Sequence, residues 1–185
     1  MNCTATAKAT PSQEALRDAL TTLMAQKPLA RIAVKELCAA AHVSRSTFYA
    51  YYDNTDELLR EVEGIHLARI AQMNEAVSNP RVNTPDDMRF YDETIEYVQD
   101  HARDFGALLV SNPSTRFVDG WKAEIKDHLR RRRAAAGATP LSSLTEEIAA
   151  SAIVSATTCY LQDPSTITPC DVHVILAKAL AALDS

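Results

Sequence analysis

A short segment after Ser44 brings together side chains that are suited to binding nucleic acid. Arg45 is the long cation at its start, and arginine pairs bidentately with guanine O6 and N7 in the major groove, which discriminates between bases by about 1–3 kcal/mol. Hydroxyl and phenol groups that could reach base edges or phosphates lie nearby, on Ser44, Ser46, Thr47, Tyr49 and Tyr51. We therefore expect a DNA-reading helix here, with Arg45 as its main base-reading residue.

A second helix must hold such a segment at an angle in the groove. Apolar side chains at helical spacing predict a preceding helix of about two turns that stops near His42; they are Val34, Leu37, Cys38 and Ala41. Ser44 is expected to cap the reading helix, 45–52, because its hydroxyl can accept from a backbone N–H two or three residues later. The expected arrangement is helix, three-residue turn, helix.

A third helix, about 12–26, is expected to complete this unit. Ser12 is its candidate N-cap, and its buried face is formed by Leu16, Leu20, Leu23 and Met24. Phe48 and Tyr52 of the reading helix are four residues apart, so both are expected to face inward onto the other two helices. Residues 1–11 are small and polar without periodicity, which predicts a flexible tail.

The rest of the chain also has helical periodicity. With four glycines and few β-branched or aromatic strand formers, the sequence favours an all-α fold of about nine helices. A loop is expected over 79–85, and Asp86 and Asp87 suit the first turn of the helix that follows. The last two helices are expected to pack as an antiparallel pair. After the reading helix, a long helix is expected from Asp53 or Asn54 to before Pro80, and another from about 86 with Tyr91, Ile95 and Val98 on its buried face. A short helix from about 105 is expected to end at Asn112-Pro113, one from about 117 is expected to end at Gly137 and Pro140, and the last two are expected at about 143–161 and 169–183.

Residues 33–59, AVKELCAAAHVSRSTFYAYYDNTDELL, resemble the helix-turn-helix of the TetR (tetracycline-repressor-like) family of transcriptional regulators. The segments KPLARIAVKELC and DHARDFGALLVSN look like the subgroup related to dihydroxyacetone-kinase regulators. The family resemblance rests on an ordered series of core, turn and surface positions, namely Val34, Leu37, Cys38, Ala41, Val43, Ser44, Thr47, Phe48, Tyr49, Tyr52, Glu57 and Leu58.

The resemblance implies three parts: a tail at 1–11, a DNA-binding domain at 12–53, and a helical effector-binding and dimerisation domain at 54–185. It implies a homodimeric, ligand-responsive repressor. Such a protein binds a pseudo-palindromic operator in double-stranded DNA and leaves it when a small-molecule effector, unknown here, is bound.

The resemblance also implies roles for individual residues. Tyr49 and Tyr51 fall where the family commonly contacts phosphates, and Lys35 matches a basic contact at the start of the second helix. Such contacts position the protein without reading sequence. Thr55 occupies the position of a family lysine at the start of the fourth helix, where the side chain contacts DNA.

Two further departures from the family pattern concern the backbone. Ala33 replaces a threonine that caps the second helix, which removes a cap worth about 1 kcal/mol. His42 replaces the glycine of the turn and is strained if that turn requires a left-handed conformation. Together with Thr55, the missing cap predicts fewer phosphate contacts and a shallower salt dependence.

Two surfaces are expected in the C-terminal part. Small and apolar residues of the last two helices suit a four-helix dimer interface, with Ile148, Ala152, Ala156, Val172, Ile175 and Leu176 as its candidate residues. An effector pocket is expected among the fourth to eighth helices. Its candidate residues, which offer flat apolar surface and hydroxyl or imidazole groups for a weakly charged ligand, are His66, Tyr91, Tyr97, His101, Phe105, Trp121 and Tyr160. Each of these side chains could equally be a core residue.

The charge distribution supports a local DNA contact. The net charge is −5, with seven basic and six acidic side chains in residues 1–60 and twelve against eighteen in the remainder. Within 26–52 the basic residues Lys27, Arg31, Lys35 and Arg45 face one acid, Glu36. The run Arg130–Arg133 is most simply a solvated, cationic helix end. An acidic total disfavours a protein that coats nucleic acid without specificity.

Several classes are disfavoured. No apolar run approaches the roughly 20 residues that span a bilayer, so no membrane partner is expected. The cysteines have no zinc-site spacing, which predicts reduced thiols in a cytoplasm and neither metal nor other cofactor. No catalytic motif points to an enzyme. The alternative to a repressor is an adaptor or coactivator that keeps the fold and acts mainly through a protein partner.

Overall fold

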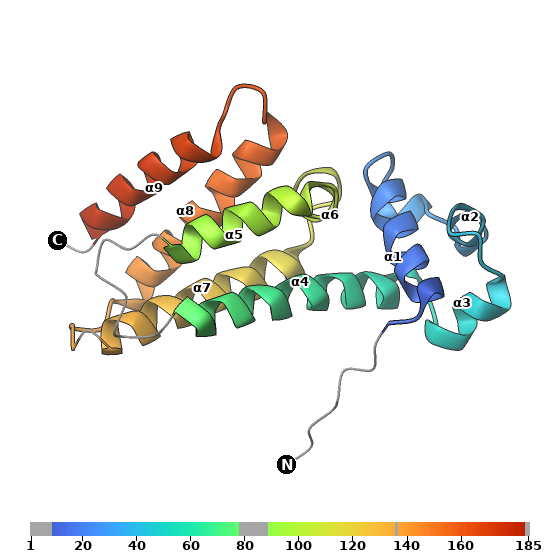
Figure 1. The fold of residues 1–185 in the computed structure, drawn as a ribbon, viewed down its shortest axis with the longest axis horizontal. Coiled ribbons are helices and arrows are strands. Elements are labelled where there is room, and N and C mark those ends of the chain that lie inside the picture. Colours follow the sequence, from blue (N-terminus) through green and yellow to red (C-terminus); the bar gives the residue numbers. More distant parts are fainter. Residues whose placement is uncertain (1–8, 78–88, 136, 184–185) are drawn as a thin grey trace, which may run out of the picture. The chain divides into compact units, whose positions relative to one another are not determined.

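The computed structural model describes residues 9–77, 89–135 and 137–183, and every regular element in these ranges is helical, which confirms the all-α prediction (Figure 1). The elements are α1 (Pro11–Met24), η1 (Leu29–Arg31), α2 (Val34–Ala40), α3 (Arg45–Tyr51), α4 (Thr55–Val77), α5 (Arg89–Asp100), α6 (Ala102–Gly106), η2 (Ala107–Ser111), α7 (Thr115–Ala135), α8 (Ser143–Gln162) and α9 (Pro169–Leu183). The loop expected at 79–85 and the helix start expected at Asp86 and Asp87 lie outside the described residues.

The chain divides into two compact units, Met1–Val62 and Glu63–Ser185, so that the division falls within α4. The sequence placed a domain boundary at 53/54, where α4 was expected to begin. The first three helices pack on one another in the first unit. Its core is formed by fully buried apolar side chains, including Leu16, Leu20, Met24, Leu37, Phe48 and Leu58.

The beginning of α1 corrects the expected cap. Thr10, and not Ser12, is the N-cap: its Oγ1 accepts from the backbone N–H of Gln13 at 3.3 Å, and the Gln13 side chain accepts from the backbone N–H of Thr10 at 3.1 Å. Pro11 occupies the first turn, where its missing N–H costs no hydrogen bond. The tail expected at 1–11 therefore ends before Thr10, and residues 1–8 are outside the described part.

The second unit is built on contacts of α8 with α7 and α9. The α8 and α9 helices form the expected hairpin, and α9 also contacts α5 (Figure 1). Beyond Phe105, where a short helix was expected, α6 passes into the π-helical stretch η2, in which Asn112 N–H donates to the carbonyl of Ala107 at 2.9 Å. This stretch ends at Ser111, two residues before Pro113, which cannot donate a backbone hydrogen bond.

Two classes of feature are missing from the described ranges. None of the helices there is long and apolar enough to cross a membrane. No group of three or more His, Cys, Asp or Glu side chains among the same residues is arranged to hold a metal ion.

Candidate nucleic-acid interface

The turn between α2 and α3 is closed by a left-handed residue. His42 has φ 54°, and its N–H donates to the carbonyl of Ala39 at 3.3 Å, while the N–H of Val43 donates to Cys38 at 3.0 Å. This pair of bonds is the Schellman arrangement, in which glycine is the usual residue at the left-handed position. The chain therefore makes the turn expected of a helix-turn-helix, with a strained histidine in place of glycine.

A hydroxyl cap sets the start of α3, the helix that the sequence predicts to read DNA. Ser44 Oγ accepts from the backbone N–H of Thr47 at 3.0 Å, which is one of the two N–H groups expected from the sequence. The hydroxyl also lies 2.7 Å from Ser46 Oγ and 2.8 Å from Thr47 Oγ1. The three hydroxyls expected at a DNA surface thus form one hydrogen-bonded group at the exposed N-terminal end of α3.

The two faces of α3 divide as the periodicity predicts. Phe48 is fully buried and Tyr52, which follows the helix, is 3% exposed. Tyr49 and Tyr51 are 51% and 39% exposed, so the phenol groups of both can reach outward from the helix. Arg45 is exposed as well, and its guanidinium carbon lies 6.0 Å from the centroid of the Tyr49 ring.

The remaining candidate contacts flank the recognition helix. Lys35 is exposed in the first turn of α2, and Thr55 is half-buried as the first residue of α4. Ala33 precedes α2 and provides no side-chain cap, as its replacement of a threonine predicts. Serine and threonine hydroxyls, two phenols and two cations therefore gather on the first unit, as the sequence proposed.

Ion pairing changes the charge that this unit can present. Lys27 pairs with Glu36, the one acid of the 26–52 segment, and Arg17 pairs with Glu61 at 3.0 Å. Arg31, at the end of η1, is exposed and was not assigned a role by its position in the sequence. Its position could have indicated a role in DNA binding, because Arg31 lies two residues before the N-cap of α2 and four residues before Lys35.

The aromatic side chains expected to line an effector pocket pack against one another in the second unit. Trp121 and Phe105 are fully buried with ring centroids 5.5 Å apart, and Phe117 joins them at 5.7 and 6.0 Å. These side chains pack against one another as part of the core of this unit. The reason is that aromatic rings at helical spacing satisfy core packing as readily as ligand binding.

The other candidates of that set occupy the margin of this core. The His66 ring is 3% exposed, with Nδ1 2.8 Å from the Tyr97 hydroxyl and Nε2 3.4 Å from a carboxylate oxygen of Asp104. His101 Nδ1 is 2.9 Å from the carbonyl of Tyr97, and the two rings are 4.2 Å apart. His66, Tyr97, His101, Phe105 and Trp121 are therefore brought together in one contiguous cluster.

Tyr91 of α5 and Tyr160 of α8 are the two remaining candidates. Tyr91 is 3% exposed, and burial raises the pKa of its phenol to about 12. The Tyr160 hydroxyl accepts from the Gln99 side chain at 3.3 Å. Within the described residues, no ring contact joins either tyrosine to the cluster around Trp121.

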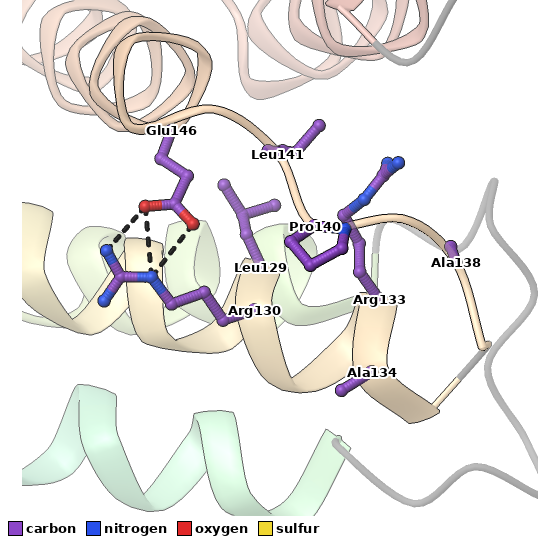
Figure 2. Close-up of a pocket in the computed structure, with 8 residues that line it drawn as sticks. All are labelled: Leu129, Arg130, Arg133, Ala134, Ala138, Pro140, Leu141 and Glu146. Carbon is purple, nitrogen blue, oxygen red and sulfur yellow. Dashed lines mark hydrogen bonds and ion pairs between the residues drawn. The ribbon is translucent and has the colours of Figure 1, made fainter.

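A pocket of about 340 Å³ opens instead at the corner between α7 and α8 (Figure 2). It shares no residue with the expected effector set. Its lining residues are Leu129, Arg130, Arg133, Ala134, Ala138, Pro140, Leu141 and Glu146.

The arginine run at this corner is not a simple solvated helix end. Arg130 binds the buried Glu146 of α8 through three contacts of 2.6 to 3.0 Å, and this hydrogen bonding lowers the pKa of the Glu146 carboxyl. Arg131 pairs with Asp127 at 2.9 Å, and Arg133 Nε donates to the carbonyl of Thr139 at 2.7 Å. The run thus ties α7 to α8 and to their connection, which one-dimensional charge counting could not show.

The expected dimer surface is partly contradicted. Val172 and Leu176 are 3% and 2% exposed within a single chain, so they belong to its own core. Ile148 and Ile175 are exposed, and Ala152 and Ala156 are half-buried. The exposed apolar set on α8 and α9 gains two residues that the sequence did not single out, Leu144 and Val174.

Comparisons with known proteins place this geometry in a family. Residues 16–62 match the family described as bacterial regulatory proteins, tetR family. No curated protein matches the chain in sequence. Among solved structures, the chain is similar to the dihydroxyacetone kinase operon activator DhaS, at 16% identity and a TM-score of 0.62 over 92% of this chain and 94% of that one.

Two other regulators have the same fold. The fatty acid degradation regulator FadR from Bacillus halodurans is 12% identical, with a TM-score of 0.72 over 96% of this chain and 97% of that one. NalD, the secondary repressor of the MexAB-OprM multidrug efflux pump in Pseudomonas aeruginosa, is 17% identical, with a TM-score of 0.65 over 92% and 94%. At these identities the likeness establishes a shared fold. Residues 16–62 thus match the tetR family of bacterial regulatory proteins, and the chain as a whole has the fold of the regulators named above.

Proposed function

We propose that the protein is a homodimeric, ligand-responsive repressor that binds a pseudo-palindromic operator in the cytoplasm and has no enzymatic activity. The observation that carries the proposal is the exposed face of α3. There Arg45 and Tyr49 are in contact and project from a helix whose start is set by the Ser44 cap and the left-handed turn at His42.

In this proposal, Arg45 reads a guanine and its neighbours position the helix. A guanidinium supplies two parallel donors to guanine O6 and N7, which no other residue of α3 can do. Ser44, Ser46, Thr47, Tyr49 and Tyr51 supply hydroxyl and phenol donors to phosphates or base edges, with Lys35 and Thr55 at the flanks. A phosphate contact adds affinity and fixes the register, and carries no sequence information directly.

The dimer is proposed to form through the exposed parts of α8 and α9. Ile148 and Ile175 are 47% and 63% exposed, and with Leu144 and Val174 they present large apolar side chains that a second copy would cover. A two-fold dimer offers two recognition helices, and so accounts for a pseudo-palindromic operator.

The effector is proposed to act on the cluster around His66, Tyr97, Phe105 and Trp121. These side chains are packed together, so a bound apolar or aromatic molecule requires an open state in which they separate. An effector that binds the open state more tightly shifts the population toward it. A difference of about 1–3 kcal/mol between states changes operator affinity by roughly 5–150-fold.

The sign of regulation is proposed from the family resemblance. Proteins with this fold include both activators and repressors, because DhaS is named an operon activator and NalD a repressor. Repression is therefore proposed here from the family resemblance and not from the fold. The membership of this chain in the dihydroxyacetone-kinase-related subgroup is likewise a proposal.

Operator selection from a randomised duplex library with the full-length protein tests the proposal. We expect a two-fold symmetric consensus, bound with an affinity that falls steeply as salt rises. Arg45→Ala should relax the consensus, and Glu14→Ala, on the first turn of α1, is a control variant outside the recognition helix. Enrichment of no sequence, with capture of a protein partner that survives high salt, would favour the adaptor alternative.

A further inference from the structure

We propose that the pocket at the α7–α8 corner is a binding site for a neutral, apolar small molecule, such as an uncharged aromatic compound. The walls belong to the end of α7, to the connection that follows it and to the first turn of α8 (Figure 2). None of the lining residues belongs to the aromatic cluster around Trp121, where the effector is proposed to act. Binding at this corner is therefore independent of the operator and of that effector.

The pocket has the size and the walls of a small-molecule site. Its volume of about 340 Å³ lies at the lower end of the range of roughly 300–1,000 Å³ that is usual for ligand pockets. An apolar cavity of roughly 150 Å³ already binds benzene, so a larger aromatic body has room here. Contact with apolar walls removes ligand surface from water, which is the driving force that this pocket offers. The apolar lining residues are Leu129, Ala134, Ala138, Pro140 and Leu141.

The rim of the pocket at the end of α7 is held by backbone hydrogen bonds. Gly137 has φ 65°, and its N–H donates to the carbonyl of Ala134 at 3.1 Å, while the N–H of Ala138 donates to the carbonyl of Arg133 at 3.0 Å. This is again the Schellman arrangement, here with the usual glycine at the left-handed position. Ala134 and Ala138 both line the pocket, so part of its wall is set by the end of the helix before a ligand binds. A preorganised wall reduces the entropy that binding costs.

The charged groups of the lining are engaged within the protein. Both carboxylate oxygens of Glu146 accept from Arg130 at 2.6 to 3.0 Å (Figure 2), and this hydrogen bonding lowers the pKa of the Glu146 carboxyl, which keeps the pair ionised at neutral pH. Arg133 Nε donates to the carbonyl of Thr139 at 2.7 Å, and Arg133 makes a further interaction besides.

This pairing selects against a charged ligand of either sign. An organic cation meets the carboxylate of Glu146 already bound by Arg130, and an organic anion has to compete with the partners that both lining arginines already have. A charged ligand would lose its hydration without gaining a new partner in exchange, which is costly. A neutral apolar molecule loses little hydration and uses the walls that the pocket provides.

The test uses N-phenyl-1-naphthylamine, a neutral aromatic probe that fluoresces when its rings leave water, with the full-length protein and no DNA. Its sulfonated counterpart, 8-anilinonaphthalene-1-sulfonate, has the same rings and one negative charge. We expect saturable binding of the neutral probe and at least about fivefold weaker binding of the sulfonate, because the sulfonate has to be desolvated.

Two matched pairs of variants locate the bound probe. Ala134→Trp puts a large side chain in the lining and should abolish binding, whereas Ala135→Trp makes the same change at the next residue, outside the lining, and should leave the affinity within about twofold. Leu141→Asn makes one apolar wall polar at similar size and should weaken binding about tenfold. Leu144→Asn makes the same change on the exposed surface of α8 and should have little effect. Far-UV circular dichroism and urea unfolding establish that each variant is folded.

Four results would overturn the inference. Equal loss in Ala134→Trp and Ala135→Trp would mean that the pocket is not the binding place. Loss in Leu144→Asn without loss in Leu141→Asn would put the probe on the exposed apolar surface of α8 and α9. Tighter binding of the sulfonate would mean that the arginines, and not the apolar walls, hold the probe. Absence of saturable binding would remove the site altogether. Since no DNA is present, a failed operator selection does not affect any of these outcomes.

Discussion

The guanidinium of Arg45 lies against the ring of Tyr49, one helical turn further along α3, with 6.0 Å between the guanidinium carbon and the ring centroid. Both side chains are exposed, so this cation–π contact is worth only about 0.5–1 kcal/mol. Its main effect is on geometry. The ring restricts where the flexible arginine can go, which prepares the guanidinium for one direction of approach to DNA.

The first prediction concerns base reading by this pair. Arg45→Ala should reduce discrimination at one base pair of each half-site by about 1–3 kcal/mol, because it removes the bidentate donor. Lys35→Ala should weaken binding to all sequences alike and lower the slope of log affinity against log salt by about 1, because one phosphate contact is lost. Fluorescence anisotropy with single-base operator variants at several salt concentrations measures both effects. An unchanged preferred sequence in Arg45→Ala would show that another residue reads the base.

The second prediction concerns the left-handed residue of the turn. His42→Gly should stabilise the first unit by up to about 1 kcal/mol, because an L side chain at positive φ costs roughly 1–2 kcal/mol and glycine's greater freedom in the unfolded chain offsets part of the gain. His42→Val should destabilise it, because a branched Cβ crowds this conformation further. Hydrogen exchange of the Val43 amide, which donates to Cys38, reports on the turn directly. Faster exchange in the glycine variant would mean that the histidine side chain itself supports the turn.

The third prediction separates surface from core on α9. Ile175→Asp should dissociate the dimer and leave the folded chain intact, because the side chain is 63% exposed. Leu176→Ala should lower the free energy of unfolding by about 2–5 kcal/mol, because its side chain is buried within one chain. Sedimentation velocity and urea unfolding measure the two properties independently. A dimer that persists in Ile175→Asp would place the interface elsewhere.

The fourth prediction concerns the buried His128 of α7. Its ring stacks on Phe90 with centroids 4.2 Å apart, and burial, with the nearby cations Arg132 and Arg131, lowers the pKa of His128 from 6.5 to about 4 despite the opposing charge of Asp127. The unfolded chain therefore binds a proton at His128 below about pH 6.5, whereas the folded chain does so only below about pH 4. The contribution of His128 to stability is complete above pH 6.5 and should fall by about 3 kcal/mol between pH 7 and pH 4.

Urea unfolding followed by Trp121 fluorescence checks this pH dependence, because Trp121 lies on the same helix. His128→Phe keeps an aromatic ring beside Phe90 and removes the titration, so its stability should depend less on pH over this window. Carboxylates contribute equally to both proteins, and the difference between the two curves isolates His128. Parallel curves would show that His128 can take up its proton without unfolding.

The local features of the DNA-binding unit were accessible from the sequence. Periodic apolar residues predicted the bounds of α3 to within one residue and the end of α2 to within two, and Ser44 was predicted as the cap of α3. Phe48 and Tyr52 were predicted to face inward. These features depend on neighbours within about four residues along the chain, which a sequence displays directly. The Thr10 cap was missed because Ser12 is as good a capping residue by type, and only the path of the backbone distinguishes them.

The division of apolar helices between core and surface was decided by the tertiary structure. Ile175 and Leu176 are adjacent and similarly apolar, and their periodicity shows only that both lie on helical faces. Leu176 is buried within its own chain and Ile175 is exposed, because α9 packs on α8 and α5 with one of these faces. The same holds for Trp121 and Phe105, whose types suit a pocket or a core equally well.

The pairing of Arg130 with Glu146 was also decided by the packing of helices against one another. These residues are sixteen apart in sequence and meet only because α7 and α8 pack as neighbours, which places two of the four arginines, Arg130 and Arg133, in the lining of a pocket. Sequence determined most of the helices, the Ser44 cap and the outward face of α3, since each follows from local spacing. Packing between helices decided which side chains are core and which are surface, and where a cavity remains, since these depend on contacts that no local pattern encodes.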